Sequence, residues 1–303
     1  MKAIQVSTPG GPDALEYVDV PTPEPGDGEV LVRVEAVGVN YIDVYHRTGQ
    51  YPMPLPFVPG SEAAGVVEST GERVGWAMVP GSCAEYARVP AERLVPLPDG
   101  VDTRTAAASL LQGMTGHYLV TSTFRIEPGH VAVVHAAAGG AGGWVVQLAK
   151  QRGAHVVATA AASKHDEVRG LGADEVFEYD DPEWTRRSAN VVYDSVGQTT
   201  FDRSMDAIGT RGMVVLFGQS SGPVDPVSPA RLAAKSAFLT RPTLAHSGVE
   251  REELLWRSRE VFEAITSGAV RLRIAGELPL AEAAEAHRLL ESRSTRGKLL
   301  LIP

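Results

Sequence analysis

The chain is poor in the residues on which several classes of protein depend. Its 303 residues include a single cysteine, Cys83, which excludes an internal disulfide and any cysteine-based zinc site within one chain. This low usage fits a reducing cytoplasm, where we expect the protein to reside. No window approaches about 18 consecutive apolar residues, so no membrane span is expected. The segment 1–6 is too short and too polar for a signal peptide.

Positive charge is scarce as well. The chain has 28 lysine and arginine residues against 37 aspartate and glutamate residues, which gives a net charge of −9. An acidic chain without a basic run binds polyanions poorly, so we expect no nucleic-acid partner. Apolar residues make up 44% and charged residues 21%, which is typical of a folded globular protein, and the length allows two domains.

The N-terminal part of the chain favours short β-strands. Apolar and polar residues alternate at Leu15–Val20 and Val30–Val37, and further strands are expected at Ala63–Val67 and Ala84–Val89. Prolines and glycines separate these runs, as in the segment 21–28, which cannot join a sheet interior. The pattern predicts a compact antiparallel or mixed β domain.

From about Asp102 the pattern changes to alternating helices and strands. An alanine-rich helix is expected over Thr105–Leu111, with Gly113 breaking it and a second helical pattern running to about Ser122. Six apolar strand runs then alternate with helical patterns, and they are centred on Val133, Val157, Val176, Val192, Val215 and Phe238. Six parallel strands with helices between them form the dinucleotide-binding arrangement.

A glycine-rich turn connects the first of these strands to a helix. The apolar run Val131–Val134 leads into small residues, and a helical pattern follows over Ala141–Arg152. Ala137 stands where the first glycine of a G-x-G-x-x-G motif would be, and Gly139 and Gly142 follow it. Such a turn lets the backbone approach a pyrophosphate, which the helix N-terminus faces with free N–H groups. The alternative is an ordinary glycine-rich turn, against which the strand–helix–strand context argues.

The C-terminal part does not continue the alternation. Two helices are expected, over about Glu250–Thr266 and Leu280–Ser292, and an apolar strand closes the chain at Leu299–Ile302. We expect this tail to return to the first domain. The predicted domains are therefore a discontinuous one, residues 1–112 and 242–303, and a dinucleotide-binding one, residues 113–241.

The residues after the second strand favour NADPH over NADH. NAD-binding proteins of this fold place an acidic residue about 20 residues after the glycine turn, to hold the ribose 2′-OH. That position falls near residues 158–160, where no acid stands, and Ser163 and Lys164 follow. A hydroxyl and an ammonium group suit a 2′-phosphate, which a carboxylate would repel. The alternative is that Lys164 is a solvated charge at a helix start.

Four stretches of the chain resemble one family. They are residues 38–45 with 49–52, residues 135–142, residues 191–197, and the tail 291–303. Together they resemble the quinone oxidoreductases, the zinc-free, zeta-crystallin-like branch of the medium-chain dehydrogenase/reductase superfamily. The resemblance implies an α/β fold with a GroES-like β-rich catalytic domain and a Rossmann domain, a doubly wound parallel six-stranded sheet. The segment 67–76 and the crossover 179–190 are shorter than is usual in the family.

The resemblance also implies a set of functional residues. Asn40, Tyr45 and Tyr51 are the implied catalytic hydrogen-bond donors, in a segment that faces the nicotinamide in the family. Lys164 matches the phosphate-binding lysine and Tyr179 the tyrosine on the adenine side. The implied cofactor-binding residues are Asn40, Tyr45, Thr115, Gly139, Gly140, Ala141, Gly142, Thr159, Ser163, Lys164, Tyr179, Ser195, Val196, Phe217, Gly218, Gln219, Leu239, Arg241 and Arg293.

No metal site is expected. Catalytic zinc needs about three cysteine, histidine or carboxylate ligands. Zinc-dependent relatives supply ligands where this chain has Asn40, Ser61 and the pair Leu111-Gln112, none of which is a good zinc ligand. Asp43 and His46 could touch a metal, although such a pair is more often engaged in surface hydrogen bonding.

These observations predict a zinc-independent reductase that transfers hydride from NADPH to small quinones or conjugated enones. Such acceptors need little polarisation because the anion that forms is delocalised. An enoyl-thioester reductase of the same superfamily and a non-catalytic NADPH-binding protein remain as alternatives. A homodimer is expected through the last Rossmann strand, residues 236–240, because an apolar edge strand invites pairing with a second copy.

Overall fold

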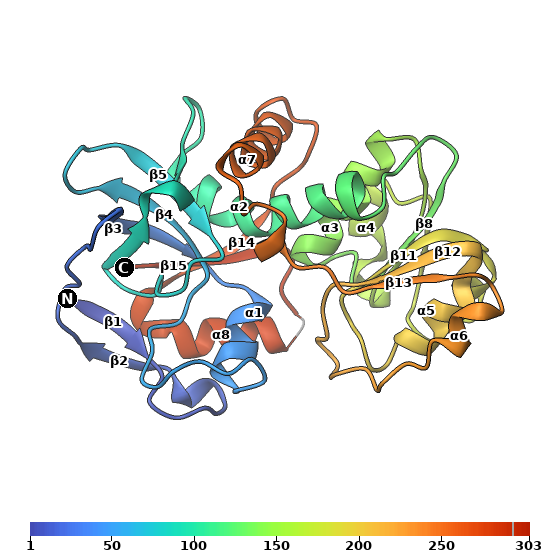
Figure 1. The fold of residues 1–303 in the computed structure, drawn as a ribbon, viewed down its shortest axis with the longest axis horizontal. Coiled ribbons are helices and arrows are strands. Elements are labelled where there is room, and N and C mark those ends of the chain that lie inside the picture. The colour runs from blue at the N-terminus through green and yellow to red at the C-terminus, as the bar shows by residue number, and fades with distance from the viewer. Residues whose placement is uncertain (293) are drawn as a thin grey trace. The chain divides into compact units, whose positions relative to one another are not determined.

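The computed structural model describes residues 1–292 and 294–303, so the predicted cofactor residue Arg293 lies outside the described residues. The chain forms two compact units, which are described separately below. The split unit consists of Met1–Met114 and Gly248–Pro303, and the central unit of Thr115–Ser247. The boundaries proposed from the sequence, at residues 112 and 241, lie a few residues before these. Both chain ends belong to the split unit (Figure 1).

The split unit is built on a seven-stranded sheet. The strand order is β14-β15-β3-β4-β5-β7, with β6 also paired to β3. The C-terminal strand β15 runs antiparallel to β3, with Leu301 opposite Val37. A separate antiparallel pair, β1 and β2, precedes the sheet. The strands are β1 Lys2–Gln5, β2 Glu16–Asp19, β3 Glu29–Gly38, β4 Glu62–Val67, β5 Arg73–Ala77, β6 Tyr86–Pro90, β7 Val95–Pro96, β14 Ile274–Pro279 and β15 Lys298–Ile302.

One helix prediction was wrong. The helices that begin in this unit are α1 Tyr41–Arg47, α2 Thr103–Tyr118, α7 Arg251–Thr266 and α8 Ala283–Glu291. Helix α2 runs through Gly113 and continues as a π-helical turn, Leu119–Thr123, instead of breaking. A glycine costs a helix about 1 kcal/mol relative to alanine. The completely buried side chains of Ala106, Ala107 and Leu110 supply more packing than that cost removes.

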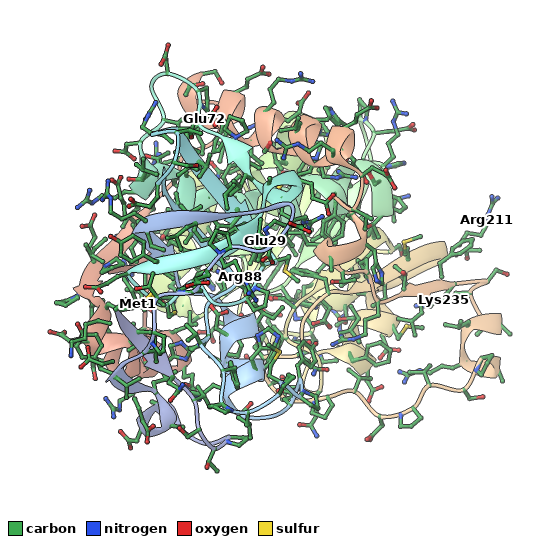
Figure 2. The ribbon with its side chains drawn as sticks, turned by 60° about the vertical axis from the view of Figure 1, so that its left-hand side comes forward. Met1, Glu29, Glu72, Arg88, Arg211 and Lys235 are labelled. Carbon is green, nitrogen blue, oxygen red and sulfur yellow. The ribbon has the colours of Figure 1, made fainter. Side chains whose placement is uncertain are left out.

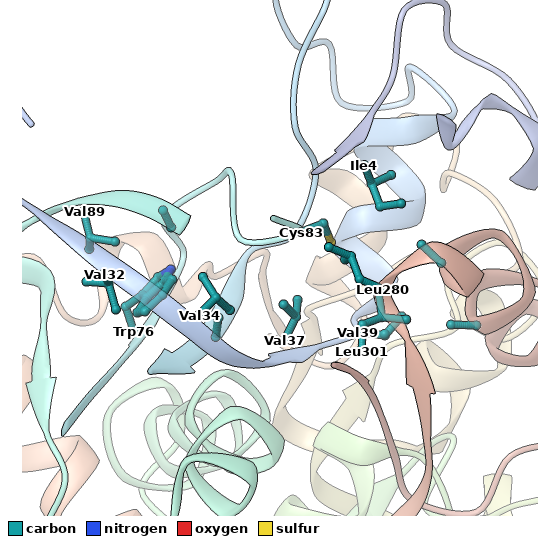
Figure 3. Packing of buried hydrophobic residues seen from close by; sticks show 14 of the residues in the cluster. Ile4, Val32, Val34, Val37, Val39, Trp76, Cys83, Val89, Leu280 and Leu301 are labelled. Atoms are coloured by element: carbon teal, nitrogen blue, oxygen red, sulfur yellow. The ribbon is translucent and has the colours of Figure 1, made fainter. Parts of the chain in front are cut away.

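The core of the split unit lies against β3. Val32 and Val34 are two residues apart, so the strand period places both on one face, where they pack with Trp76 (Figure 3). The outer surface is charged. In Figure 2 the labelled Glu29 and Arg88 come from the paired strands β3 and β6, and their side chains form an ion pair 3.2 Å long.

The central unit has the predicted doubly wound parallel sheet. All six predicted strands form, and every neighbouring pair is parallel. The order is β10-β9-β8-β11-β12-β13, so the direction of strand addition reverses between β8 and β11, which is the switch point of a dinucleotide-binding sheet. The strands are β8 Val131–Val134, β9 His155–Thr159, β10 Glu175–Phe177, β11 Ala189–Asp194, β12 Ile208–Leu216 and β13 Phe238–Thr240.

The helices of the central unit connect these strands. They are α3 Gly140–Gln151, α4 His165–Gly170, α5 Phe201–Ala207 and α6 Ala230–Ala233. The crossover from β10 to β11 holds only a short 3₁₀ helix, Glu183–Arg186, as its length predicts. Among the described residues, no helix is both long and apolar enough to span a membrane.

Candidate functional site

The predicted cofactor residues of the central unit gather at one edge of its sheet. They follow β8, β9, β10, β11, β12 and β13 in turn, apart from Thr115 on α2, Thr159 at the end of β9 and Leu239 within β13. Because all six strands are parallel, their carboxyl ends meet at the same edge. Ligands of doubly wound sheets bind there, outside the strand ends at the switch point.

The glycine turn between β8 and α3 is tightly closed. Ala136 has a φ of +49°, which non-glycine residues rarely adopt, and Gly139 N donates to its carbonyl at 2.8 Å. A Cβ at Gly142 would lie 2.3 Å from the same Ala136 oxygen, so only glycine fits there. Helix α3 begins at Gly140 and presents its first N–H groups to the turn. This geometry suits a pyrophosphate.

The predicted cofactor residues at the end of β9 and after it differ in burial. Ser163 is exposed and Lys164 half-buried, in a 3₁₀ helix over Ala162–Lys164 that leaves both near the surface. Thr159 is different, because it is completely buried and its hydroxyl lies 2.7 Å from His135 Nδ1. The cofactor-binding role of Thr159 stays a prediction, and its hydroxyl is bonded inside the domain.

The short crossover after β10 is held by hydrogen bonds from side chains to backbone carbonyls. The carbonyl of Tyr179 accepts from Trp184 Nε1 at 3.1 Å and also from the Arg203 guanidinium. Arg203 donates to the Asp181 carbonyl at 2.5 Å as well, and it lies over the Trp184 ring. These contacts fix the backbone of Tyr179, whose side chain is half-buried.

The remaining predicted residues of this unit are of two kinds. Phe217, Gly218, Gln219, Leu239 and Ser195 are half-buried, and Arg241 is exposed and donates to Gln219 Oε1 at 2.9 Å. Thr115 and Val196 are buried, at 8% and 5% exposure, and the Val196 N–H is held by Asp194 Oδ1 at 2.8 Å. The cofactor-binding roles of Thr115 and Val196 stay predictions.

In the split unit, Asn40 caps helix α1 and is buried. Its backbone N–H donates to Asp43 Oδ2 at 3.0 Å. Its side-chain nitrogen donates to the Gly38 carbonyl and to Glu62 Oε2, both at 2.9 Å. Both amide hydrogens are thus committed within the unit. The role predicted for Asn40, donating a hydrogen bond to an acceptor, conflicts with this geometry, because Asn40 would first have to break one of these bonds.

A buried ion pair completes this cluster. Lys298 Nζ donates to Asn40 Oδ1 and Glu62 Oε2, both at 2.6 Å, and neither Lys298 nor Glu62 is more than 2% exposed. Glu62 Oε1 accepts the backbone N–H of Leu111 at 2.6 Å. A Cβ at Gly38 would lie 2.5 Å from Glu62 Oε2, which explains a glycine at the end of β3.

The cluster fits a fixed ammonium group better than a metal. On the family resemblance, zinc-dependent relatives supply ligands at Asn40, at Ser61 and near Leu111-Gln112, and the cluster contacts each of these segments. Ser61 Oγ donates to Asp43 Oδ1 at 2.7 Å, and Asn40 Oδ1 already accepts from Lys298. A dication beside that ammonium would be repelled. In the described part of the chain, no group of three or more His, Cys, Asp or Glu side chains could hold a metal.

The carboxyl group of Asp43 has a raised pKa. Burial raises the pKa of its carboxyl from 3.8 to about 6, against the opposing effects of the Ser61 and Asn40 hydrogen bonds and of Lys298. The sequence suggested a metal contact or surface hydrogen bonding for Asp43 and His46. Asp43 is instead 2% exposed and bonded within the unit.

This pKa predicts a pH-dependent stability difference. A raised folded-state pKa stabilises the fold fully below pH 3.8, and that contribution is lost as the pH rises through about 6. The free energy of unfolding of Asp43→Asn, compared with that of wild type, should therefore rise by up to about 3 kcal/mol between pH 4 and pH 7. This figure follows from about 1.4 kcal/mol per pKa unit. Urea denaturation at several pH values measures it. Asp19→Asn should show the opposite trend, because Lys2 lowers the pKa of Asp19. A pH-independent difference for Asp43→Asn would contradict the prediction.

Two tyrosines lie next to the cluster in sequence. Tyr45, on α1, is 7% exposed, and Tyr51, after the helix, is half-buried. Their ring centroids are 5.0 Å apart in an edge-to-face arrangement. This packing gives both hydroxyls defined positions, since aromatic pairs of this geometry stabilise each other.

Sequence reasoning missed Glu62, Lys298 and His135 as members of these sites. Lys298 carried a signal, because it opens an otherwise apolar strand and a lysine at such a position is rarely buried without a partner. His135 opens one of the stretches that carry the family resemblance, but neither His135 nor Glu62 carried a signal for its hydrogen-bond partners, which are remote in sequence.

Comparisons with known proteins agree with this architecture. Residues 26–99 match the alcohol dehydrogenase GroES-like domain, and residues 171–301 match a family described as zinc-binding dehydrogenase. A quinone oxidoreductase of Pseudomonas aeruginosa is 40% identical, with 100% of this chain and 99% of the relative covered. The alignment spans 323 positions, more than the 303 residues of the chain, so the relative has segments that this chain lacks.

Two further similar proteins have names that state a cofactor or a substrate. A mycobacterial protein solved in complex with NADPH is 43% identical, with a TM-score of 0.96 and both chains fully covered. A 2-haloacrylate reductase from a Burkholderia species is 36% identical, with 97% of this chain and 96% of the relative covered.

Proposed function

The chain belongs to the quinone oxidoreductase family of the medium-chain dehydrogenase/reductase superfamily, and we propose that it reduces quinones or conjugated enones with NADPH, without zinc. The observation that supports the zinc-free part is the cluster of Asn40, Glu62 and Lys298, where a buried ammonium group donates to Asn40 Oδ1 and to Glu62 Oε2. Without a metal, a simple carbonyl is polarised only weakly, whereas a conjugated acceptor spreads the charge that hydride brings.

NADPH fits the residues of the central unit. The glycine turn and the start of α3 would hold the pyrophosphate, and Ser163 with Lys164 would hold the 2′-phosphate. When bound, NADPH supplies the hydride from its nicotinamide ring. The similar mycobacterial structure with NADPH supports this assignment. A cytoplasmic location stays a prediction from the cysteine usage.

The phosphate assignment gives a first test. Lys164→Ala should weaken NADPH binding about tenfold, the equivalent of about 1.4 kcal/mol, and should leave NADH nearly unchanged. Fluorescence titration of both nucleotides measures this. Lys150→Ala is the matched control. Lys150 lies in the last turn of α3, at the end of the helix remote from the glycine turn, and its side chain forms an ion pair with Asp174. Equal weakening of NADPH and NADH by Lys164→Ala would refute the assignment.

The acceptor class is tested by turnover. We propose that the hydroxyls of Tyr45 and Tyr51, whose rings pack against each other, donate hydrogen bonds to the acceptor. NADPH oxidation is followed with a quinone, an enone and a saturated aldehyde. The quinone and enone should react and the aldehyde should not. Tyr51→Phe should slow turnover modestly, while Tyr17→Phe, at an exposed position, should not. Efficient aldehyde reduction would show that the reaction class is wrong.

Two alternatives are distinguished in the same assay. The 2-haloacrylate reductase shows by its name that a relative acts on an activated alkene, which favours a conjugated double bond as an acceptor. Adding an enoyl thioester to the panel tests for an enoyl-thioester reductase. A protein that binds NADPH and turns over none of the acceptors would be a non-catalytic binding protein.

We also propose a homodimer through β13. Among the described residues, this strand pairs only with β12, and Phe238 at its start is 54% exposed. A second copy pairing along this edge would cover both the backbone groups and Phe238. Light scattering at micromolar concentration should give a dimer mass for wild type and a lower mass for Phe238→Glu. A monomeric wild type would refute the proposal.

A further inference from the structure

A chain of buried polar groups lies beneath the glycine turn of the central unit. His135, at the carboxyl end of β8, has Nδ1 2.7 Å from Thr159 Oγ1 and Nε2 3.0 Å from Ser204 Oγ. Ser204 Oγ is in turn 2.8 Å from Asp194 Oδ2. All four residues are completely buried. They come from β9, β8, α5 and β11, so the chain crosses the middle of the sheet.

The partners fix the direction of each hydrogen bond. Asp194 accepts from the backbone N–H groups of Val196 and Gly197 and from the hydroxyl of Thr200, as a carboxylate does. Ser204 also lies 3.0 Å from the Thr200 carbonyl, but the carboxylate is nearer and is the stronger acceptor.

If Ser204 donates to Asp194, its oxygen accepts from His135. Nε2 of His135 then carries the hydrogen, and Nδ1 accepts the hydroxyl hydrogen of Thr159. Burial lowers the pKa of His135, which agrees with a neutral ring. The Trp184 ring packs edge-on against the imidazole, with centroids 4.8 Å apart.

This polar chain joins the segments that form the candidate cofactor edge. Next to His135 is Ala136, with its positive φ, and Ala137 N donates to the Thr159 carbonyl at 3.2 Å. Asp194 holds the N–H groups of the segment 195–197 after β11. A single network therefore links the glycine turn, the end of β9 and the loop after β11.

We propose that His135 is a positioning residue for NADPH, and that its neutral ring holds the glycine turn in the conformation that receives the pyrophosphate. The inference rests on the proposed function only in taking NADPH as the ligand. A strained residue such as Ala136 persists only where its surroundings hold it, and the ring of its neighbour His135 is hydrogen-bonded to both Thr159 and Ser204. The ring contacts Thr159, Ser204 and Trp184, and its proposed action on the turn runs through the backbone at Ala136.

The test compares NADPH affinity with stability. His135→Phe keeps the ring and removes both hydrogen bonds, so it should weaken NADPH at least about tenfold in a fluorescence titration. His135→Gln, which can still donate to Ser204, should lose less. His130→Phe is the matched control, since His130 precedes the opposite end of β8 and should leave NADPH affinity unchanged. ¹⁵N NMR of labelled histidine should show a neutral ring with hydrogen on Nε2.

A purely structural role would lower the melting temperature of His135→Phe and leave its NADPH affinity intact, and that result would overturn the proposal. If His135→Phe does not fold, Thr159→Val and Ser204→Ala each remove one hydrogen-bond partner of His135, and unchanged NADPH affinity in both would overturn the proposal equally. Wild type that binds NADPH but reduces no acceptor refutes the proposed function alone. Wild type that binds no NADPH refutes both.

Discussion

Replacing Lys298 with methionine is expected to destabilise the protein by about 3–5 kcal/mol, the usual effect of removing one partner of a buried ion pair. The variant leaves Glu62 buried without its cation and takes from Asn40 Oδ1 its hydrogen-bond donor. The loss should appear as a lower midpoint in urea denaturation. Turnover should fall as well, because Asn40 caps the helix that carries Tyr45.

Two further variants make this result specific. Lys298→Met combined with Glu62→Gln removes both charges and should recover much of the stability, since no unpaired charge stays buried. Lys2→Met is the matched control: Lys2 pairs with Asp19 at 2.7 Å, a similar distance, but both side chains are solvated, so little change is expected. A single Lys298→Met variant as stable as wild type would show that the pair does not hold this cluster together.

Gly142→Ala is expected to weaken NADPH binding more than tenfold. The new Cβ would lie 2.3 Å from the Ala136 oxygen and 2.9 Å from its carbonyl carbon. Both neighbours are backbone atoms, so the turn itself has to move, and its N–H groups move with it. Overpacking of this kind also lowers stability, by about 1–3 kcal/mol. Titration with NADPH and urea denaturation measure the two effects separately.

A second glycine in the same unit provides the control. Gly170 ends helix α4, and a Cβ there would meet nothing within 4 Å. Gly170→Ala should therefore leave NADPH affinity unchanged and keep or slightly raise stability, because alanine favours a helix over glycine. If Gly142→Ala behaved like Gly170→Ala, the tight turn would not be needed for binding.

Local pattern was enough to predict the central unit. Six apolar runs of strand length predict its six strands, and each run depends only on residues near it in sequence. The edge where the candidate cofactor residues gather then follows from topology, because the ends of parallel strands must meet. Gly113 in α2 shows the limit of local pattern, since long-range packing outweighed its helix-breaking tendency.

The sequence by itself determined the two-part fold, the family, the glycine turn and the missing acid after β9. Only the tertiary structure decided which side chains meet. Lys298 and Asn40 are 258 residues apart, and nothing in their neighbourhoods marks them as partners. Thr159 ends β9 and His135 follows the neighbouring strand β8, and the fold buries the threonine hydroxyl against the histidine ring. Periodicity sets which face of an element is buried, whereas polar pairing inside the fold depends on which elements become neighbours.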